Sequence, residues 1–576
     1  MSQARNNLPK YLNKYITNQD YSKYNAIDQA VWKYIMFISV PFYKKYAHSV
    51  YLEGLEKTGI PINHIPKIDE MDEKLDQFGW GAVAVKGFIP PTAFMDMLAN
   101  KVLAIGVDIR TAEHLMYTPA PDIIHETAGH APIIADKDYA NYLCSYGEVS
   151  KMAISSLEDN EVYEIIRKLS DLKENPNASQ KEIKKYEQSL VELSKKDTIV
   201  SEAAQLARMN WWTAEYGMIG SIKNPKIYGA GLLSSVIEGF ESIDPKIKKI
   251  KYDLNCINYN YDITEPQPQL FVTDNFKNLK TQLEKYSSSM AYVTGGLDGL
   301  NKALNSKTVN TIVLDSKVSV SGILKEFHTN KKNISYLQFT GPSQLCYNKN
   351  EITNQGTEFH PEGFGCPLGK IERLNKSIFQ CNVKDLDTLG LILGKITTLK
   401  YKSGITLTGK VENIQYINKK PLIITFSNCS IKNNKNIFFK PEWGNFDLIS
   451  GIEVTSVHGG AADYDKFYNN NQSLNYVQSS TLTEENKELN EFYDYIQKVK
   501  LSQNNNANKL NQLYEYVISK YPQEWLLLFE ILYKIDDDLN FSELKDKIKN
   551  KLISFCNKKE NQAIIIKRGF ELIFKS

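Results

Sequence analysis

The spacing of apolar residues changes twice along this chain, and no single fold accommodates all three patterns. From residue 21 to about 286, apolar residues recur mostly at helical spacing. From 309 to about 457 the apolar runs are short, rich in Val, Ile, Thr and Tyr, and separated by turn-forming residues. Helical spacing then returns from 481 to about 574. A chain of 576 residues is also too long for one ordinary core. We therefore expect a multidomain protein: a mostly α-helical domain, a β-rich domain and a C-terminal helical segment.

Three segments carry the helical prediction for the first domain. Residues 30–38 have one apolar face that Trp32 and Met36 widen, which predicts a largely buried helix. Thr92–Ala104 has a similar spacing and is also predicted to be helical. Residues 157–193 differ, because they are rich in Lys and Glu and are interrupted by Asn-Pro-Asn. We interpret that segment as a charged helical hairpin inserted into the first domain.

The middle region is predicted to be all β, of sandwich or small-barrel type. We place the domains at residues 1–306, 307–463 and 481–576, and the last two match no pattern with a known role. The expected strands are Val309–Leu314, Ile334–Phe339, Leu391–Leu399, Ile405–Val411 and Pro421–Phe426.

Charge and composition exclude several classes of function. The net charge is only +2, which gives no support for a nucleic-acid partner. The seven cysteines never form Cys-x-x-Cys, so neither a disulfide framework nor a thiolate zinc site is expected. The apolar stretches are too short for a membrane span, and the first residues have no apolar signal region. We expect a cytoplasmic protein with no membrane partner, and leave open a homo-oligomer or a protein partner bound through residues 307–576.

The sequence His125-Glu126-Thr127-Ala128-Gly129-His130 is the first sign of chemistry. Zinc proteases place two histidines four residues apart, so that both lie on one helix face. Here the separation is five residues, which a regular α-helix cannot aim at one ion. A local distortion or a helix end must therefore intervene if both histidines bind a metal. A zinc hydrolase built on His125, Glu126 and His130 stays open, although the spacing disfavours it.

A carboxylate would complete such a site. Glu215 lies among aromatic residues, where a carboxylate is costly to bury without a cation or hydrogen-bond donors. Two histidines and one carboxylate are the set that holds non-heme Fe(II) with open coordination positions. Glu202 and Glu238 are alternatives for the carboxylate that spacing alone does not exclude.

Several ordered motifs together resemble a known family. The longest runs from Met116 to His130 as Met-Tyr-Thr-Pro-x-Pro-Asp-Ile-x-His-Glu-x-x-Gly-His. Gly-Phe-Ile at 87–89 precedes it, and Trp-x-Thr-x-Glu at 211–215, Tyr-Gly-Ala-Gly-Leu-Leu-Ser-Ser at 228–235 and Thr-Glu-x-Gln-Pro at 264–268 follow. In this order they resemble the pterin-dependent aromatic amino acid hydroxylases over residues 60–280. The resemblance implies a mostly helical catalytic domain that uses Fe(II), a tetrahydropterin and molecular oxygen.

The resemblance also assigns roles by position. The implied iron ligands are His125, His130 and Glu215. The implied substrate contacts are Arg110, Thr118, Trp211 and Ser234, and the implied pterin contacts are Gly87, Ile89, Phe94 and Glu126. Glu126, Trp211 and Ser234 are the residues implied to act in catalysis, and Ser234 matches a serine that supports a histidine ligand.

The expected reaction is the hydroxylation of free phenylalanine to tyrosine. Ile263 lies where tyrosine-specific relatives have an acidic residue, and an apolar side chain there favours an unsubstituted ring. Two alternatives stay open: a tryptophan or tyrosine hydroxylase of the same family, and a non-catalytic amino-acid sensor that acts through residues 307–576.

Overall fold

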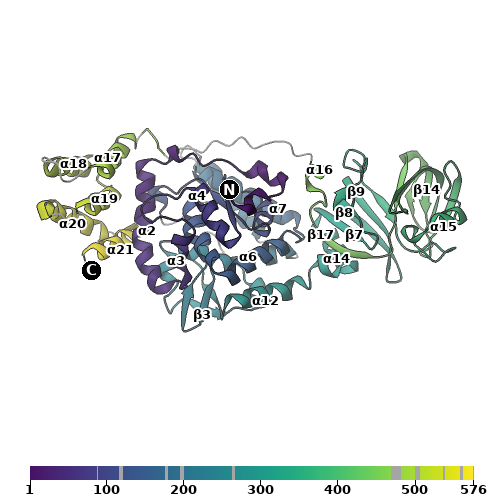
Figure 1. The fold of residues 1–576 in the computed structure, drawn as a ribbon, viewed down its shortest axis with the longest axis horizontal. Coiled ribbons are helices and arrows are strands. Elements are labelled where there is room, and N and C mark those ends of the chain that lie inside the picture. Colours follow the sequence, from purple (N-terminus) through teal and green to yellow (C-terminus); the bar gives the residue numbers. More distant parts are fainter. Residues whose placement is uncertain are drawn as a thin grey trace.

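The computed structural model describes residues 1–86, 89–115, 121–174, 179–194, 200–261, 266–468, 482–484, 486–499, 506–535, 539–557 and 562–574. The molecule is elongated, with a mostly helical region in the middle, β-sheets at one end and the C-terminal helices at the other (Figure 1). Three regions were predicted from the two changes in apolar spacing, but in space the first region lies between the other two (Figure 1).

The first region is built around a long buried helix, α2 (Ala26–Tyr46). The side chain of Asn25 caps its first turn, and the carboxylate of Asp28 accepts from the backbone N–H of Asn25, so the helix begins with a capping box. Two helices, α7 and α8, contact each other where the charged hairpin is predicted. The other main helices are α3 (Val50–Lys57), α4 (Ile68–Leu75), α5 (Pro91–Ala99), α6 (Lys137–Ser150), α7 (Leu157–Glu174), α8 (Gln180–Ser194), α9 (Glu202–Asn210) and α12 (Phe276–Ser287).

Two small sheets interrupt this helical region. β1 (Gly81–Val85) pairs in parallel with β2 (Val102–Gly106), and both are completely buried. The prediction of one helix over Thr92–Ala104 is therefore wrong at its end: α5 stops at Ala99, and Lys101 turns the chain with a φ of 59°. A short, fully apolar run is compatible with both a buried helix and a buried parallel strand, so spacing could not separate them. The second sheet has four strands in the order β4 (Asn224–Ile227), β3 (Met218–Ser221), β6 (Gln269–Thr273) and β5 (Lys248–Lys251).

The β-rich region contains two sheets with separate cores, whereas one sandwich or small barrel with a shared core was predicted. The six-stranded sheet has the order β10-β9-β8-β7-β17, with β11 beside β9, and the five-stranded sheet has the order β12-β13-β14-β15, with β16 beside β14. The chain enters at β7 and leaves at β17, which pairs with β7, so both ends of the region lie side by side. The strands are β7 (Val309–Leu314), β8 (Val318–Asn330), β9 (Asn333–Tyr347), β10 (Asn350–Glu351), β11 (Gly365–Pro367), β12 (Ile396–Lys400), β13 (Thr406–Ile417), β14 (Lys420–Lys432), β15 (Ile437–Phe439), β16 (Phe446–Ile449) and β17 (Val454–Gly459).

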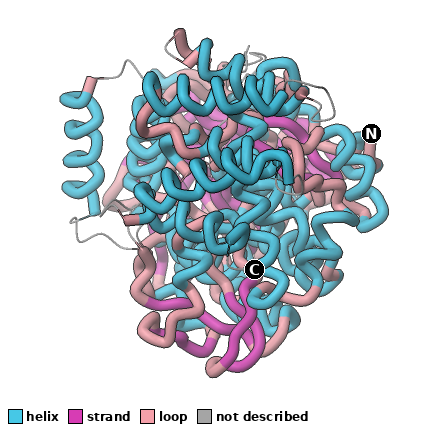
Figure 2. Tube along the Cα trace, turned by 90° about the vertical axis from the view of Figure 1, so that its left-hand side faces the viewer, coloured by secondary structure: helices cyan, strands magenta, loops and turns pink. Residues whose placement is uncertain are grey.

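The C-terminal region is helical, as predicted, and lies at the far end of the molecule from the sheets. In the view turned by 90°, these helices lie on the side that faces the viewer (Figure 2). α17, α19 and α21 contact α2. The helices are α17 (Lys487–Lys498), α18 (Asn506–Lys520), α19 (Leu526–Ile535), α20 (Ser542–Cys556) and α21 (Gln562–Phe574).

The apolar cores divide the molecule differently from the three expected domains. Buried residues of the C-terminal helices, such as Leu527 and Ile566, belong to the same core as α2 and the rest of the first region. The two β-sheets have cores of their own. Leu300 and Ala303, in helix α14 (Gly296–Ser306), belong to the core of the six-stranded sheet. Among the described residues, no helix has the length and apolar character needed to cross a membrane.

Candidate metal centre

Two short π-helical segments carry the residues that the sequence singles out. The first, η5, runs from His125 to His130 and contains the five-residue histidine spacing. The backbone N–H of Ala131 donates to the carbonyl of Glu126, which is the i→i+5 bond of a π-helix. The wider turn places both histidines on one face, with ring centroids 5.0 Å apart. The sequence argument that a local distortion must intervene is confirmed.

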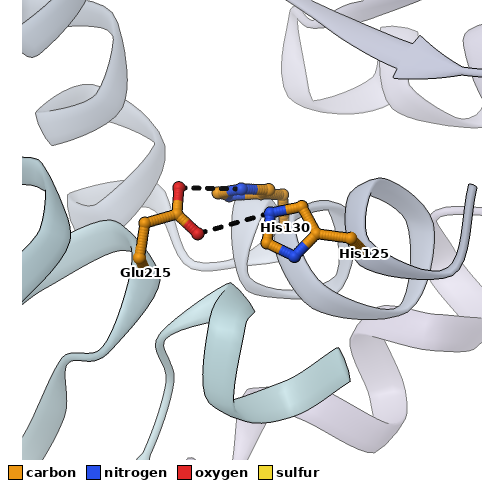
Figure 3. Close-up of side chains that lie close together, drawn as sticks. All are labelled: His125, His130 and Glu215. Carbon is orange, nitrogen blue, oxygen red and sulfur yellow. Dashed lines mark ion pairs between the residues drawn. The ribbon is translucent and has the colours of Figure 1, made fainter. Parts of the chain in front are cut away.

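The second segment, η7 (Trp211–Glu215), directly continues α9 and presents Glu215 to the two histidines. Its backbone has the same wide turn, because the N–H of Tyr216 donates to the carbonyl of Trp211 at 2.8 Å. One oxygen of Glu215 lies 3.3 Å from Nε2 of His125, and the other lies 3.3 Å from Nε2 of His130 (Figure 3). Within the part of the chain that the structure describes, these three residues form the only group of three or more side chains that could hold a metal ion.

Ser234 orients the ring of His125. Its hydroxyl donates to the carbonyl of Ala230 at 2.8 Å, so its oxygen accepts from Nδ1 of His125 at 3.0 Å. A neutral His125 with its proton on Nδ1 turns the lone pair of Nε2 toward the carboxylate of Glu215. Such a lone pair and a carboxylate oxygen 3.3 Å apart could bind one cation together. The donor set therefore fits a divalent metal of the non-heme iron type.

The carboxyl groups around the centre have strongly altered acidities. Burial alone would raise the pKa of Glu215, but His130 and His125 hold it well below its usual range. The pKa of the neighbouring Glu126 changes in the opposite direction, because burial raises it to about 8. One oxygen of Glu126 is buried and has no hydrogen-bond partner in the structure. A buried oxygen of this kind fits a ligand that brings its own N–H or O–H donors.

The two alternative carboxylates are used elsewhere. Glu202 accepts from the backbone N–H groups of Ile154 and Ala291 and pairs with Lys302. Glu238 accepts from the hydroxyl of Tyr216 at 3.0 Å. The fold thus brings Glu215, and not Glu202 or Glu238, to the histidine pair.

Arg110 and Asp122 form a buried ion pair next to η5. Nε and Nη2 of Arg110 donate to the two oxygens of Asp122, each at 2.8 Å, and Nη1 donates to the carbonyl of Ser234 at 3.2 Å. Asp122 also caps the helix that leads into η5, because it accepts from the backbone N–H of His125 at 3.0 Å. Burial opposes the charge of Asp122, but Arg110 holds its pKa below the usual value. These bonds use three of the five N–H groups of the guanidinium and leave one on each terminal nitrogen.

Asp122 is a site residue that the sequence analysis did not select. Its position three residues before His125 is the spacing of a helix N-cap, and this was the available signal. Its second partner, Arg110, lies outside the motif, so only the fold could reveal the pair.

Trp211 lies in a stack of three aromatic rings. Its ring is 4.7 Å from Tyr216 and 4.3 Å from Tyr261, and both pairs are nearly parallel. Its indole N–H donates to the side-chain oxygen of Gln267 at 3.2 Å. Tyr216 and Tyr261 were not selected from the sequence, because aromatic residues are equally common in ordinary cores.

Two of the residues predicted to contact the pterin, Ile89 and Phe94, lie near the parallel pair β1 and β2. Phe94, on α5, and Ile89 are partly buried against a small core that includes Val85 and Met97. Leu12, from the first residues of the chain, is also buried in this core. β2 contacts η5, which brings this sheet next to the histidines. Gly87, Thr118 and Ile263 lie outside the described residues, so their predicted roles stay predictions.

Comparison with known proteins adds the family context. The model of the biopterin-dependent aromatic amino acid hydroxylases matches residues 3–172 and 174–338, more than half of the chain.

Individual relatives match a smaller part of the chain. It is 29% identical over 266 residues to phenylalanine-4-hydroxylase of Mesorhizobium japonicum, across 46% of this chain and 80% of that protein. It is 26% identical over 318 residues to tyrosine 3-monooxygenase of Rattus norvegicus, across 53% of each. A crystal structure of Chromobacterium violaceum phenylalanine hydroxylase with bound iron(III) and 7,8-dihydrobiopterin is 26% identical, across 48% of this chain and 85% of that one, with a TM-score of 0.38.

Proposed function

This chain belongs to the family of biopterin-dependent aromatic amino acid hydroxylases, and we propose that it hydroxylates free phenylalanine to tyrosine. The observation that carries the proposal is the convergence of His125, His130 and Glu215 on two π-helical turns within the matched region. Phenylalanine is favoured as substrate because the relative from Mesorhizobium japonicum, which is 29% identical, is named phenylalanine-4-hydroxylase.

In this proposal His125, His130 and Glu215 hold iron. Two neutral imidazoles and one carboxylate leave coordination positions open, as the family's chemistry requires. When bound, iron and tetrahydropterin together supply the activation of molecular oxygen. The chain itself holds the donor atoms in place: Ser234 fixes the proton of His125 on Nδ1, and Asp122 caps the turn that carries His125.

The pterin would bind on the side of Glu126. Its unpartnered oxygen provides an acceptor for a ring N–H, and a carboxyl with a pKa of about 8 can also donate a proton in a hydrogen bond. Phe94 and Ile89, next to β1 and β2, supply apolar surface for a planar ring. Gly87 is proposed as a further pterin contact on the resemblance alone.

The amino acid would bind between Arg110 and Trp211. The two N–H groups that remain on Arg110 suit a carboxylate, and the pair with Asp122 fixes their direction. Trp211, held between Tyr216 and Tyr261, would form an aromatic wall for the substrate ring. Thr118 is kept as a substrate contact on its position in the motif.

The test is a turnover assay on the purified full chain with Fe(II) and tetrahydropterin. Phenylalanine, tyrosine and tryptophan are offered separately, and the products are identified by mass spectrometry. We expect tyrosine from phenylalanine only when both iron and pterin are present. Another hydroxylated product would keep the class and change the substrate. Binding of phenylalanine without any product would favour a sensor, and cleavage of an added peptide substrate with zinc alone would favour a hydrolase.

The Glu215→Ala variant tests the assignment of the third ligand. Removal of the carboxylate that faces both histidines should abolish tyrosine formation and sharply weaken metal binding. Glu362→Ala, at an exposed position in the β-rich region, is the control and should retain both. Wild-type turnover by Glu215→Ala would contradict the ligand set.

A further inference from the structure

The C-terminal helices are joined to the first region by specific polar contacts as well as by apolar packing. The side-chain oxygen of Asn490, on α17, accepts from the first N–H groups of α2, those of Ala26 and Ile27. The hydroxyl of Tyr34, on α2, donates to the carbonyl of Ile565 on α21 at 2.9 Å. Because these bonds satisfy buried backbone groups, they fix how α17 and α21 lie against α2.

One residue of α21 contacts the first region beyond α2. Nη1 of Arg568 donates to the backbone carbonyl of Val236. Its guanidinium also lies over the ring of Phe240, 4.0 Å from the ring centroid. The ring of Phe42 stacks on Phe240 as well, with the two centroids 4.0 Å apart. A planar cation that bonds a carbonyl and stacks on an aromatic ring is held in one orientation.

Val236 lies in the middle of a segment whose two ends support the metal centre. We call residues 234–238 the support segment. At its first residue, the hydroxyl of Ser234 accepts from His125 and its carbonyl accepts from Arg110. At its last residue, Glu238 accepts from the hydroxyl of Tyr216 at 3.0 Å.

Glu238 extends this support to the second π-helical segment. Its other oxygen accepts from the backbone N–H of Gln267 at 3.2 Å, and Gln267 in turn accepts from the indole of Trp211. Both segments that carry the metal ligands are therefore tied to the support segment.

We propose that Arg568 is a positioning residue of the metal centre, and that the C-terminal helices are a structural part of the active site. The proposal rests on the proposed function only in taking His125, His130 and Glu215 as metal ligands. Arg568 holds the carbonyl of Val236, and through it the hydroxyl of Ser234 that orients His125. Hydrogen-bond partners that orient a metal-bound histidine typically change metal affinity or activity by about 10–100-fold when removed.

The effect of Arg568 should be smaller, because the support segment has a second anchor. Tyr43, on α2, donates to the carbonyls of Leu232 at 2.6 Å and Ser235 at 3.3 Å. Loss of Arg568 would therefore loosen the segment without releasing it. We expect the affinity for metal to fall by about 3–10-fold, at or below the lower end of the range for direct partners.

The test compares Arg568→Met and Arg568→Lys in the full chain. Methionine keeps an apolar contact with Phe240 but removes the donor, whereas lysine keeps a donor and a charge without the planar face. Lys567→Met is the matched control, because Lys567 is the exposed neighbour on the same helix. Co(II) titration followed by visible absorption measures the affinity and geometry of the centre without turnover, and thermal unfolding reports whether each variant is folded.

The expected result is a weaker Co(II) affinity and an altered Co(II) spectrum for Arg568→Met, with partial recovery in Arg568→Lys and no change in Lys567→Met. With saturating iron, kcat for tyrosine formation should fall while the KM for tetrahydropterin stays unchanged, since among the described residues no hydrogen bond joins Glu126 to the support segment. If Arg568→Met is too unstable to purify, Arg568→Lys decides: a Co(II) spectrum and affinity equal to wild type would overturn the proposal.

The two proposals fail separately. Wild-type protein that forms no hydroxylated amino acid, combined with a lower Co(II) affinity in Arg568→Met, would remove the proposed reaction and keep the positioning role. Normal turnover in wild type, combined with unchanged Co(II) affinity, spectrum and kcat in both Arg568 variants, would keep the reaction and overturn the positioning role.

Discussion

The β-rich region and the C-terminal helices both follow the first region in sequence, yet they are attached to it in opposite ways. The β-sheets have two cores that are separate from the main core of the first region, although the core of the six-stranded sheet also includes Ile154 and Ala291. They meet the first region where α13 (Ala291–Thr294) and α14 pack on β17 and where the backbone N–H of Gly459 donates to the carbonyl of Met152. The C-terminal helices share the core of the first region, and Arg568 extends from them to the support segment.

This difference indicates that the two regions differ in how strongly their folding is coupled to that of the first region. A region with its own core can unfold without exposing the buried surface of its neighbour. A region that shares a core cannot, because its removal leaves apolar side chains such as Phe37 and Tyr34 of α2 in water. We therefore expect the first region and the C-terminal helices to unfold together, and the β-sheets to unfold separately.

The largest expected effect comes from matched core substitutions in the two regions. Leu527 on α19 and Leu407 on β13 are both completely buried. Each change to Ala should lower the free energy of unfolding by about 2–5 kcal/mol. In Leu527→Ala the Co(II) spectrum should be lost at a lower denaturant concentration, whereas Leu407→Ala should leave that midpoint unchanged. An equal shift of the Co(II) midpoint in both variants would show that the molecule unfolds as one unit.

Metal binding should distinguish the same two units in the wild-type protein. A metal at 100 times its dissociation constant stabilises the unit that binds it by about 2.7 kcal/mol. Calorimetry should show an upward shift of the transition that contains the first region and the C-terminal helices, with the β-sheet transition unmoved. Glu215→Ala is the control and should lose the shift. A β-sheet transition that rises with added metal would contradict the separation.

The junction between the β-sheets and the first region can be weakened at one glycine. A Cβ on Gly459 would overlap the carbonyl oxygen of Ala153, so Gly459→Ala must move β17 away from residues 152–154. We expect a loss of about 1–3 kcal/mol, as for other overpacked sites. Limited proteolysis should cut this junction faster, while Co(II) affinity stays at the wild-type value. A fall in Co(II) affinity would mean that the β-sheets also support the centre.

A smaller effect is expected from one hydrogen bond between α2 and α21. Tyr34→Phe removes the donor to the carbonyl of Ile565 but keeps the ring, so the cost should be about 1 kcal/mol. Tyr416→Phe, at an exposed position on β13, is the control and should have no effect. Both are measured by denaturant unfolding with the Co(II) spectrum as the signal. An unchanged midpoint in Tyr34→Phe would indicate that this contact does not join the two parts.

Much of the fold was predictable where one local pattern dominated. Val309–Leu314 was predicted to be a strand, and β7 has these bounds, because a β-branched run between turn residues has few other structures. β8 was not predicted, since Gly322 and the polar end of the strand interrupt its apolar run. The widened apolar surface near Trp32 and Met36 predicted a buried helix, but it could not indicate that the C-terminal helices cover one side of α2.

The candidate site likewise has features that the sequence predicted and features that it did not. The five-residue spacing of His125 and His130 predicted a departure from α-helical geometry, because that constraint lies within six consecutive residues. The partner of Arg110 was missed, since Asp122 is recognisable only as a helix cap until the fold brings the two together. Arg568 gave no signal at all, because it acts on a carbonyl 332 residues away.

The sequence by itself determined the local chemistry of this protein: the distorted turn that presents two histidines, the three regions with different secondary structure, and the motifs of the family. Only the tertiary structure decided which carboxylate faces the histidines, which residues hold Arg110 and Trp211, and which distant region contacts the support segment. The physical reason is range. Backbone geometry and side-chain spacing act over a few residues, whereas packing and buried hydrogen bonds join residues at any separation along the chain.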